Sequence, residues 1–364
     1  MIVTLGFRRE GAKAQRKTTR IRWRELLFFS SLRLCVKAFA FETVTTQSNR
    51  ARNLIFAADL GGTHLRAATV DHHGRIQFHF KQNTPPEKDA NAIVDAIVAA
   101  VHECEQQSGS VDQISAVSLV VPGTVKVDEG VVVKAPNLPC LDGFRLGAAL
   151  TEQLGLPAII ENDANAAAVG EMWRGAAVGC NTIICVTLGT GVGGGIILDG
   201  KLWRGVDGAA AEIGHMCVDP FGGVACTCGS RGCLEVFASA TAIVRMTREA
   251  SPRYPDSKLQ GKEDHTAKMI FEAGQEGDDL ALEIFRRMGV YLGIGLANLI
   301  NILNPEMIVI GGGVVNSWDL FEKHMHQQVE ECAFPLLASR VKIVRAKCGD
   351  DAGLLGAARL AFSR

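Results

Sequence analysis

The sequence Asp59-Leu60-Gly61-Gly62-Thr63 has a counterpart later in the chain, Thr187-Leu188-Gly189-Thr190-Gly191. Each copy follows an apolar run typical of a buried strand and leads into a second apolar run. That second run ends in a polar turn, at Asp71 in the first copy and at Asp199-Gly200 in the second. Each copy therefore predicts a hairpin whose turn can accommodate a phosphate group. Two such hairpins indicate two similar halves that face one another across a cleft.

The rest of the chain alternates between strand and helix patterns, which predicts an α/β protein. Strands are expected at Leu54–Ala58, Leu65–Val70, Ile114–Val121, Ala158–Ile160, Met307–Ile310 and Val341–Val344. Helices are expected at Asp89–Gln107, Ala281–Leu303, Trp318–Glu331 and after Gly353. We divide the chain into an extension over residues 1–52, an N-terminal α/β domain over 53–170 and a C-terminal α/β domain over 171–350. The last helix, within 351–364, is expected to pack back on the N-terminal domain.

Composition limits the classes of function. The 364 residues are 47% hydrophobic and carry a formal net charge of −1, so the chain can bury a large core. Because residues 1–52 carry a net charge of +9, residues 53–364 carry −10 and show no basic surplus for a nucleic-acid partner. No run approaches eighteen apolar residues, so no membrane span is expected. Eleven cysteines, with one cluster among them, favour the reducing cytoplasm over a disulfide framework.

The extension over residues 1–52 is rich in Arg and poor in acids, and it has one short apolar patch, Leu26 to Phe29. A start codon assigned too far upstream, or a disordered tail, is the favoured interpretation. A targeting peptide and a basic DNA-binding arm are the alternatives, although the apolar patch is too short for a secretory signal.

Two familiar nucleotide motifs can be set aside. The run Gly189-Thr190-Gly191-Val192-Gly193-Gly194 matches G-x-G-x-x-G, but a Rossmann site needs a helix directly after the glycines. Here the glycines lead into Gly195-Ile196-Ile197-Leu198 and a turn, which is a hairpin. A P-loop is excluded as well, because no G-x-x-x-x-G-K-[ST] occurs in the sequence.

The paired glycine turns instead predict a phosphate site made of backbone amides. Asp59, at a strand end beside the first turn, can hold hydrated Mg²⁺. Three further glycines after a strand, Gly311–Gly313, would let an adenine and ribose lie against the backbone. The alternative is that these are ordinary hairpin and strand-to-helix turns. The nucleotide-side candidates are Asp59, Gly61, Gly62, Thr63, Gly189, Thr190, Gly191, Gly311, Gly312 and Gly313.

Asp163 is the candidate catalytic base. It lies in Glu161-Asn162-Asp163-Ala164-Asn165, where a short strand ends and a strong helix former begins. In open α/β sheets, chemistry takes place at the carboxyl ends of strands, and a phosphoryl transfer to a hydroxyl needs a proton acceptor there. The alternative is that Asp163 only caps the helix.

The most specific signal is a possible metal site. His215 is followed by Cys226-Thr227-Cys228-Gly229-Ser230-Arg231-Gly232-Cys233, so three thiolates and one imidazole can complete a tetrahedral Zn²⁺ shell. Cys217 is a competing ligand, but it lies too near His215 in sequence to join it easily. We interpret the zinc as structural, because no coordination position is left open. The alternative is a chance cluster of reduced cysteines.

These motifs together resemble the ROK family of repressors and sugar kinases from about Asn53 to the C-terminus. The stretch Leu188–Gly195 with Glu212-Ile213-Gly214-His215 is similar to the family signature, and Cys226–Cys233 with Glu235 is similar to its zinc motif. The resemblance implies the actin-like, ribonuclease H-like ATPase fold, with two α/β domains around a cleft that close on sugar and ATP. The basic extension is a departure from the pattern of the bacterial glucokinase branch, which Glu161–Ala168 and Gly349–Gly353 otherwise resemble most.

The resemblance also implies roles for single residues. Asp163 matches the base, and the residues that match hydroxyl-binding positions are Asn137, Asn162, Asp163, Glu212, His215 and Glu235. The metal ligands would be His215, Cys226, Cys228 and Cys233, with one nitrogen of His215 on zinc and the other toward sugar. The implied cofactors are ATP, Mg²⁺ and Zn²⁺, and the implied assembly is a homodimer or homotetramer.

The expected activity is phosphorylation of the 6-hydroxyl of glucose. A kinase for fructose, mannose or N-acetylmannosamine is the close alternative. A sugar-responsive repressor of the same family would need an N-terminal helix-turn-helix domain, and residues 1–52 are short for one and lack its periodicity. A zinc-bound module without activity is disfavoured by Asp163 and the two glycine hairpins.

Overall fold

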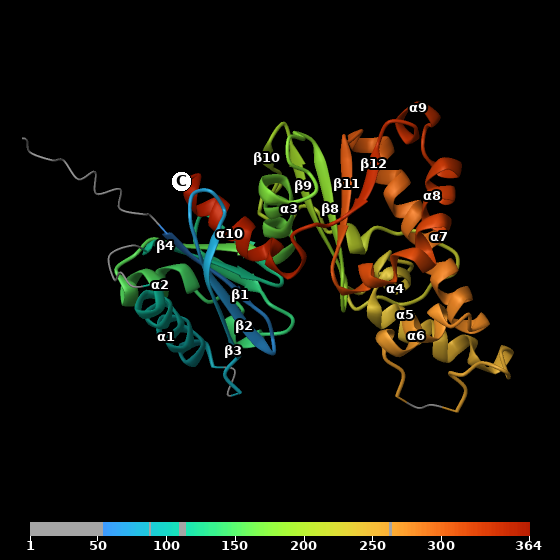
Figure 1. Cartoon of the computed structure of the whole chain (residues 1–364), viewed down its shortest axis with the longest axis horizontal. Coiled ribbons are helices and arrows are strands. Elements are labelled where there is room, and N and C mark those ends of the chain that lie inside the picture. Colours follow the sequence, from blue (N-terminus) through green and yellow to red (C-terminus); the bar gives the residue numbers. More distant parts are fainter. Residues whose placement is uncertain (1–53, 87–88, 109–113, 262–263) are drawn as a thin grey trace, which may run out of the picture. The chain divides into compact units, whose positions relative to one another are not determined.

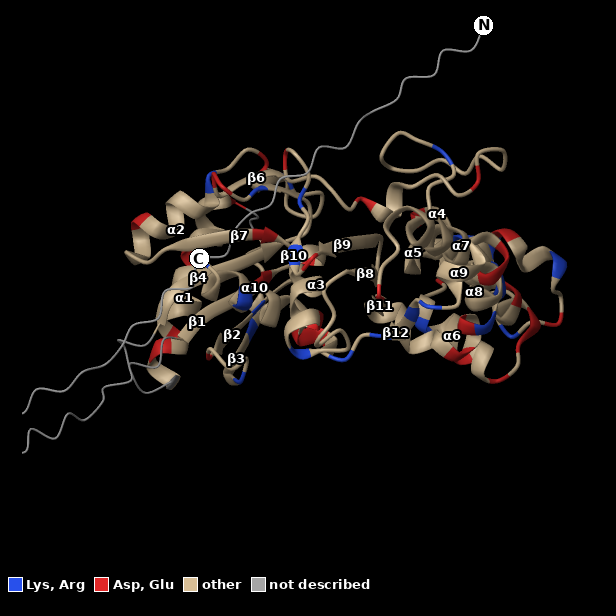
Figure 2. Cartoon of the chain, turned by 90° about the horizontal axis from the view of Figure 1, so that it is seen from above, with Lys and Arg blue, Asp and Glu red and all other residues tan. Residues whose placement is uncertain are grey.

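The structure is a computed structural model that describes residues 54–86, 89–108, 114–261 and 264–364, all within one compact unit (Figure 1). Residues 1–52 lie outside this range, so the expectations for the extension remain predictions. Among the described helices, none combines the length and apolar character needed to cross a membrane. Acidic and basic residues are interspersed along the elements (Figure 2).

The first half of the described chain forms a five-stranded sheet with the order β3-β2-β1-β4-β7. The antiparallel part consists of β1 (Leu54–Leu60), β2 (His64–Val70) and β3 (Ile76–Asn83). The strands β4 (Ile114–Val121) and β7 (Ala158–Asn162) continue the sheet in parallel to β1. Between them, β5 (Thr124–Lys126) and β6 (Val131–Lys134) pair as a separate ribbon, followed by the short helix η1 (Pro139–Leu141).

The second half repeats this arrangement in the order β10-β9-β8-β11-β12. Here β8 (Ile183–Leu188), β9 (Val192–Leu198) and β10 (Lys201–Leu202) are antiparallel, and β11 (Met307–Gly311) and β12 (Lys342–Arg345) run parallel to β8. Between β10 and β11 the chain forms η2 (Ile213–His215), α4 (Glu235–Ala238), α5 (Ala240–Ala250), η3 (Ser251–Arg253), α6 (Ala267–Gln275) and α7 (Asp279–Leu303). Then η4 (Gly313–Ser317), α8 (Trp318–Cys332) and α9 (Pro335–Ala338) connect β11 to β12.

Each sheet has helices on both faces, because its strands alternate buried side chains between two cores. Helices α1 (Ala90–Ser108) and α2 (Leu146–Leu154) cover one face of the first sheet, where Leu54 and Phe56 are buried. Helix α10 (Ala352–Phe362) covers the other face, where Ile55 and Ala57 are buried. In the second sheet, α5 to α8 cover one face, and α3 (Asp163–Arg174) covers the other.

The two sheets are joined through a close contact between α3 and α10, which lie side by side (Figure 1). Gly170 faces the carbonyl oxygen of Ala352, and Gly356 faces that of Ala166. A Cβ atom added at these glycines would lie 2.1 and 1.7 Å from the respective oxygens. The helix backbones therefore touch directly. Since α10 packs on β1 and β4 and α3 packs on β8 and β9, this contact connects the two halves.

The predicted α/β class and the paired hairpins are confirmed. Most predicted elements are present with ends shifted by a few residues; for example, the helix expected at Ala281–Leu303 begins two residues earlier. Strand β3 was not predicted, because its alternating exposed and half-buried residues lie at a sheet edge and lack an apolar run. The helices α2, α5 and α6, the short helices α4 and α9 and the ribbon β5–β6 were also missed.

Candidate active site

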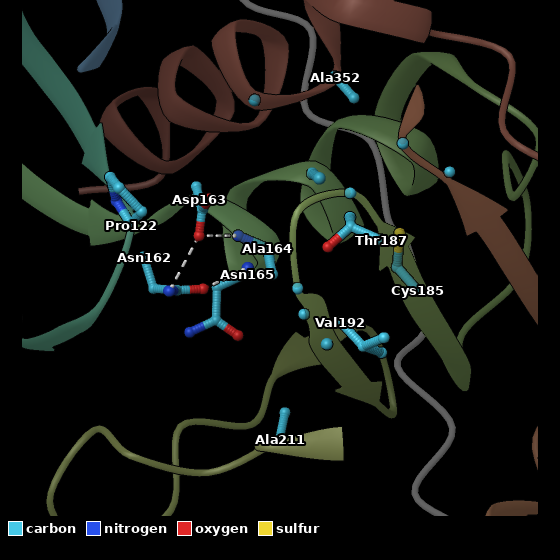
Figure 3. A pocket seen from close by; sticks show the side chains of 18 of the residues that line it. Pro122, Asn162, Asp163, Ala164, Asn165, Cys185, Thr187, Val192, Ala211 and Ala352 are labelled. Atoms are coloured by element: carbon cyan, nitrogen blue, oxygen red, sulfur yellow. Dashed lines mark hydrogen bonds between the residues drawn. The ribbon is translucent and has the colours of Figure 1, made fainter. Parts of the chain in front are cut away.

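A pocket of about 750 Å³ opens at the carboxyl ends of strands from both sheets. Asp59 near the end of β1, the second glycine turn after β8 and Gly311–Gly313 at the end of β11 line it. Asn162 at the end of β7 and Asp163 at the start of α3 line it as well (Figure 3). The predicted site residues that line it are Asp59, Asn137, Asn162, Asp163, Gly189, Thr190, Gly191, Glu212, His215, Glu235, Gly311, Gly312 and Gly313. Residues far apart in sequence thus meet at one place.

The first glycine turn does not line this pocket. Gly61, Gly62 and Thr63 are tied to Thr84: the Thr84 amide donates to the carbonyl of Thr63 at 2.9 Å, and its hydroxyl donates to that of Gly61 at 2.7 Å. Gly62 packs against Asn137, which does line the pocket. The turn is thus adjacent to a residue that lines the pocket but is not itself among the lining residues, and its role toward a nucleotide stays a prediction.

Asp163 is the first residue of α3, and the helix is capped by its neighbour. The Asn162 side chain accepts a hydrogen bond from the amide of Asn165 at 3.0 Å, as an N-cap residue does. The alternative interpretation of Asp163 as the cap is therefore wrong. Its Oδ1 accepts from the Ala164 amide at 2.9 Å and from the Asn162 Nδ2 at 3.1 Å (Figure 3). Both of these bonds use Oδ1, so Oδ2 is the oxygen available to a substrate.

The environment of Asp163 raises the pKa of its carboxyl from 3.8 to about 6. Desolvation in the pocket is the larger cause, and the negative charge of Asp59 is the second. The two hydrogen bonds to Oδ1 limit the rise, since they favour the charged form. A carboxyl with a pKa just below neutral is ionised at pH 7 yet basic enough to accept a proton during a reaction.

Arg66 is a pocket residue that the sequence analysis missed. It lies on β2 directly opposite Asp59 on β1, and its guanidinium donates to Oδ2 of Asp59. Its other terminal nitrogen is 3.7 Å from Oδ2 of Asp350, which is almost fully exposed. The signal was available, because cross-strand pairing of a hairpin follows from its turn length. Arg66 thus places a positive charge in the pocket beside the carboxylates of Asp59 and Asp350.

Glu212, Glu235 and Asn137 also line the pocket. Glu235, the first residue of α4, accepts a hydrogen bond from the Val192 amide at 3.0 Å. This brings its carboxylate against Gly191, where an added Cβ would lie 2.3 Å from Oε2. Glu212 precedes η2 and is more than half exposed, so its carboxylate is open to a ligand.

The second glycine turn and Gly311–Gly313 are in contact. Gly312 has φ +86°, and a Cβ there would lie 2.4 Å from the carbonyl oxygen of Leu188, so only glycine fits. Next to this contact, a second and largely apolar pocket of about 460 Å³ lies over α5. Both pockets share Thr190, whose carbonyl accepts from the Thr241 hydroxyl at 2.8 Å.

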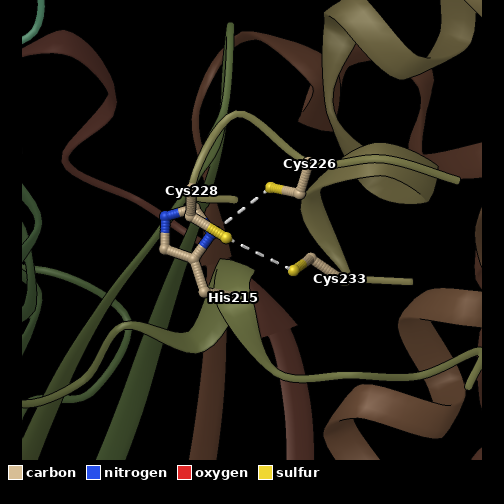
Figure 4. A group of neighbouring side chains, drawn as sticks. All are labelled: His215, Cys226, Cys228 and Cys233. Carbon is tan, nitrogen blue, oxygen red and sulfur yellow. Dashed lines mark hydrogen bonds between the residues drawn. The ribbon is translucent and has the colours of Figure 1, made fainter. Parts of the chain in front are cut away.

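His215, Cys226, Cys228 and Cys233 form one group whose possible ligand atoms all lie within 4.8 Å of one another (Figure 4). The Cys226 Sγ is 3.6 Å from Nδ1 of His215, and the Sγ atoms of Cys228 and Cys233 are 3.7 Å apart. In a tetrahedral zinc site, the bond lengths place a sulfur and a nitrogen about 3.6 Å apart and two sulfurs about 3.8 Å apart. The donor set and spacing therefore fit such an ion, and Cys217 is not part of the group.

The two nitrogens of His215 face different ways. Nδ1 faces the cysteines, whereas Nε2 is 3.9 Å from Oε2 of Glu212 on the pocket wall. The geometry agrees with the expectation that one nitrogen serves the metal group and the other serves the pocket, and the role itself remains a prediction.

A family model described as the ROK family matches residues 55–364. The chain belongs to the ROK family. It is 40% identical over 305 residues to a glucokinase of Halalkalibacterium halodurans, a match that covers 82% of this chain and 92% of that protein. It is 30% identical over 327 residues to a xylose repressor of Caldicellulosiruptor bescii, covering 88% of this chain and 81% of the repressor.

A solved ROK glucokinase from Streptomyces griseus, in complex with glucose and AMPPNP, superimposes with a TM-score of 0.73 at 38% identity. The match covers 85% of this chain and all of that one. The predicted ROK membership and the actin-like, ribonuclease H-like ATPase fold are confirmed.

Proposed function

We propose that this ROK protein is an ATP-dependent glucokinase, which transfers the γ-phosphoryl group of ATP to the 6-hydroxyl of glucose. The products are glucose 6-phosphate and ADP. The observation that carries the proposal is Asp163, an ionised carboxylate with a raised pKa and one available oxygen, in a pocket shared by glycine turns and polar side chains. The match to nearly the whole length of a glucokinase supports it.

In the reaction, Asp163 accepts the proton of the 6-hydroxyl as that oxygen attacks the γ-phosphorus in line. Arg66 offers positive charge to the transferred phosphoryl group. Asp59 would hold the Mg²⁺ that accompanies ATP, directly or through water, with the carboxylate oxygen that Arg66 leaves free. That ion neutralises phosphate charge when it is bound.

We assign the two ends of the pocket to different ligands. The phosphates lie against the amides of Gly189–Gly191, and the adenosine lies between Gly311–Gly313 and the adjoining pocket over α5. The sugar lies at the wall formed by Asn137, Asn162, Glu212, His215 and Glu235, within reach of Asp163.

We also propose that the group of His215, Cys226, Cys228 and Cys233 holds a structural Zn²⁺. This ion would shape the loop that leads from Glu212 to Glu235 and would leave the chemistry to Asp163. Residues 53–170, with the last helix, and residues 171–350 would act as two domains that close on the substrates and exclude water. We place the enzyme in the cytoplasm, where thiols stay reduced.

A coupled assay with ATP, Mg²⁺ and a panel of hexoses tests the function. We expect the highest kcat/KM with glucose. A higher value with fructose, mannose or N-acetylmannosamine would keep the kinase and change its substrate. Absence of turnover with every hexose, together with sugar-dependent DNA binding, would instead identify a repressor like the xylose repressor that the chain also resembles.

A further inference from the structure

Glu161 is a fully buried carboxylate next to the proposed base that the mechanism does not use. It lies on β7 two residues before Asp163, and its side chain is 1% exposed. Its Oε1 accepts from the Asn162 amide at 3.0 Å and from Nδ2 of Asn165 at 3.1 Å. A buried charge is tolerated only when its hydrogen-bonding capacity is met, so the donors at its other oxygen are structurally required.

Those donors come from the second half of the chain. Arg204 binds Oε2 of Glu161 with two nitrogens, Nε at 2.8 Å and Nη2 at 2.7 Å. Arg204 follows β10, at the edge of the second sheet, whereas Glu161 belongs to the first sheet. Two bonds from one planar guanidinium fix its orientation as well as its distance.

The pair anchors what we call the Arg204 segment, residues 203–212. The segment leaves the second sheet at Trp203, whose amide donates to the Ile196 carbonyl at 2.8 Å. Its middle meets the first half again at Gly208, where an added Cβ would lie 2.5 Å from the Val125 carbonyl oxygen. It closes on itself through a bond of 3.1 Å from the Ala210 amide to the Arg204 carbonyl.

The end of this segment lines the pocket in an unfavourable backbone conformation. Ala211 has φ +65°, which a residue with a Cβ rarely adopts, and it directly precedes Glu212. Both residues line the pocket, and Ala211 is visible there in Figure 3. Such a conformation persists only where the surrounding structure holds it. Locally, the Ala211 carbonyl accepts a bond from the Ile213 amide at 2.7 Å. Arg204 and Gly208 fix the part of the segment that leads into Ala211.

We propose that Glu161 and Arg204 form a positioning pair, which sets Glu212 at a fixed place relative to Asp163 and so determines how the sugar is held. The Glu161 carboxylate contacts both of the parts that carry these residues. Its Oε1 holds the Asn162–Asn165 turn that carries Asp163. Its Oε2 holds the Arg204 segment that carries Glu212. Neither residue of the pair lines the pocket. The hydrogen bonds of the pair reach Asn162, Asn165 and the Arg204 segment, and none of them reaches Gly189–Gly191 or Gly311–Gly313. We therefore expect its effect to fall mainly on the sugar.

The test rests on the proposed function and compares Arg204→Met, Arg204→Lys and the double variant Arg204→Met/Glu161→Gln with the wild type. In Arg204→Met we expect the KM for glucose to rise about tenfold or more, since small misplacements of bound groups are costly. The KM for ATP should stay within about twofold, because the pair does not reach that side. Arg204→Lys keeps the charge but loses the fork, and should recover part of the glucose affinity.

The double variant separates positioning from stability. Arg204→Met alone leaves a buried charge unpaired and is expected to lower the melting temperature. The Glu161→Gln change removes that charge, and the amide oxygen of the new side chain can still accept both bonds now made to Oε1. The double variant should therefore melt close to the wild type while the KM for glucose stays high. Recovery of both quantities together would overturn the proposal, as would equal rises of the two KM values.

Arg286→Met is the matched control, because Arg286 also binds one carboxylate with two nitrogens, at Glu283 on the exposed face of α7. It should leave both KM values unchanged. If the wild type turns over no hexose, the proposed function is wrong. If the wild type is active and the Arg204→Met variant keeps the wild-type KM for glucose, only the positioning role is wrong.

Discussion

The hairpins β1–β2 and β8–β9 occupy the same place in their two sheets but differ in charge. In the first, Asp59 pairs across the hairpin with Arg66; in the second, Thr187 pairs with Gly193. The turns also differ in length, since Leu60 pairs with Leu65 and Leu188 pairs with Val192. The second turn is thus one residue shorter, and it is the one that lines the pocket.

This difference follows from how tightly each hairpin is packed. Helix α3 packs so closely on β9 that a Cβ at Gly195 would lie 2.7 Å from the Ala164 carbonyl oxygen. At Gly193, the position on β9 that matches Arg66, an added Cβ would lie 2.6 Å from Oγ1 of Thr187 and 3.0 Å from Cβ of Ala164, so a long charged side chain has no room there. In the proposed function, the second hairpin would offer neutral backbone amides to phosphates, whereas the first places the charges of Asp59 and Arg66 in the pocket.

The largest effect is expected from removing the negative charge of Asp163. We expect Asp163→Asn to fold normally and to lose about 10²–10⁴ in kcat, the usual contribution of a general base. Asp89→Asn is the control, because Asp89 is an exposed carboxylate that accepts amide bonds at the start of α1. Steady-state kinetics and thermal melting of both variants provide the measurement. Near-normal turnover in Asp163→Asn would show that this carboxylate is structural.

The next test compares the two hairpins directly. Arg66→Met should lower kcat about 10²-fold, the typical cost of removing one group that stabilises transition-state charge. Thr187→Ala, at the position equivalent to Asp59 in the second hairpin, should change kcat only severalfold. Kinetics at saturating glucose and ATP distinguish them. Equal losses would mean that the two hairpins share the chemistry.

Removing one proposed zinc ligand should weaken the binding of glucose more than that of ATP. We expect about one zinc per chain in protein purified without chelator, and a loss of glucose affinity of about tenfold in Cys228→Ser. ATP affinity should change much less, since the loop carries Glu212 and Glu235. The melting temperature should also fall, because binding energy of a structural metal is folding energy.

Elemental analysis measures the zinc content, and separate titrations with glucose and ATP measure the affinity for each ligand. Cys217→Ser is the control, since Cys217 lies near the group but outside it. Metal-free protein with full glucose affinity would reject the zinc site, and equal losses for the two ligands would reject its link to the sugar.

The pH dependence tests the electrostatic link between the first hairpin and Asp163. Because the base must be ionised, kcat/KM should fall as the pH drops below about 6, the pKa of Asp163. Arg66→Met leaves the Asp59 charge uncompensated and should move this acid limb to higher pH. Thr187→Ala should leave it in place, and an acid limb near the ordinary 3.8 in the wild type would contradict the assignment.

The same pKa has a consequence for folding. The native pKa of Asp163 lies above the ordinary 3.8, so the native state holds this proton more tightly than the unfolded chain. The resulting stabilisation is complete below pH 3.8 and is lost as the pH rises through about 6. Melting curves of the wild type and Asp163→Asn should therefore diverge over this window in favour of the variant at the higher pH.

The smallest effect is expected from deleting residues 1–52. The family match begins at residue 55, and all pocket residues lie after it, so kinetics and melting temperature should stay near those of the full chain. An insoluble or inactive product would show that the extension takes part in the fold.

The parts of the site that could be predicted are those defined by short sequence motifs. Glycine turns, the Cys226–Cys233 spacing and the Asp163 strand end follow from short-range chemistry and could be located without coordinates. Arg66 and Arg204 were missed, because their importance depends on what lies across a hairpin or on another sheet. The motif at Gly61 to Thr63 was equally clear in the sequence, but its hydrogen bonds with Thr84 could not be foreseen, and its role toward a nucleotide stays a prediction.

The glycine contact between α3 and α10 bears on how sequence variants of this protein will be interpreted. Gly170 and Gly356 do not line the pocket, yet even alanine at either position would force two helix backbones apart. A scan of substitutions scored by growth or turnover would therefore rank both glycines with Asp163 as intolerant positions. Melting curves would separate them, because a glycine variant fails by losing its fold, whereas Asp163→Asn keeps the fold and loses the reaction.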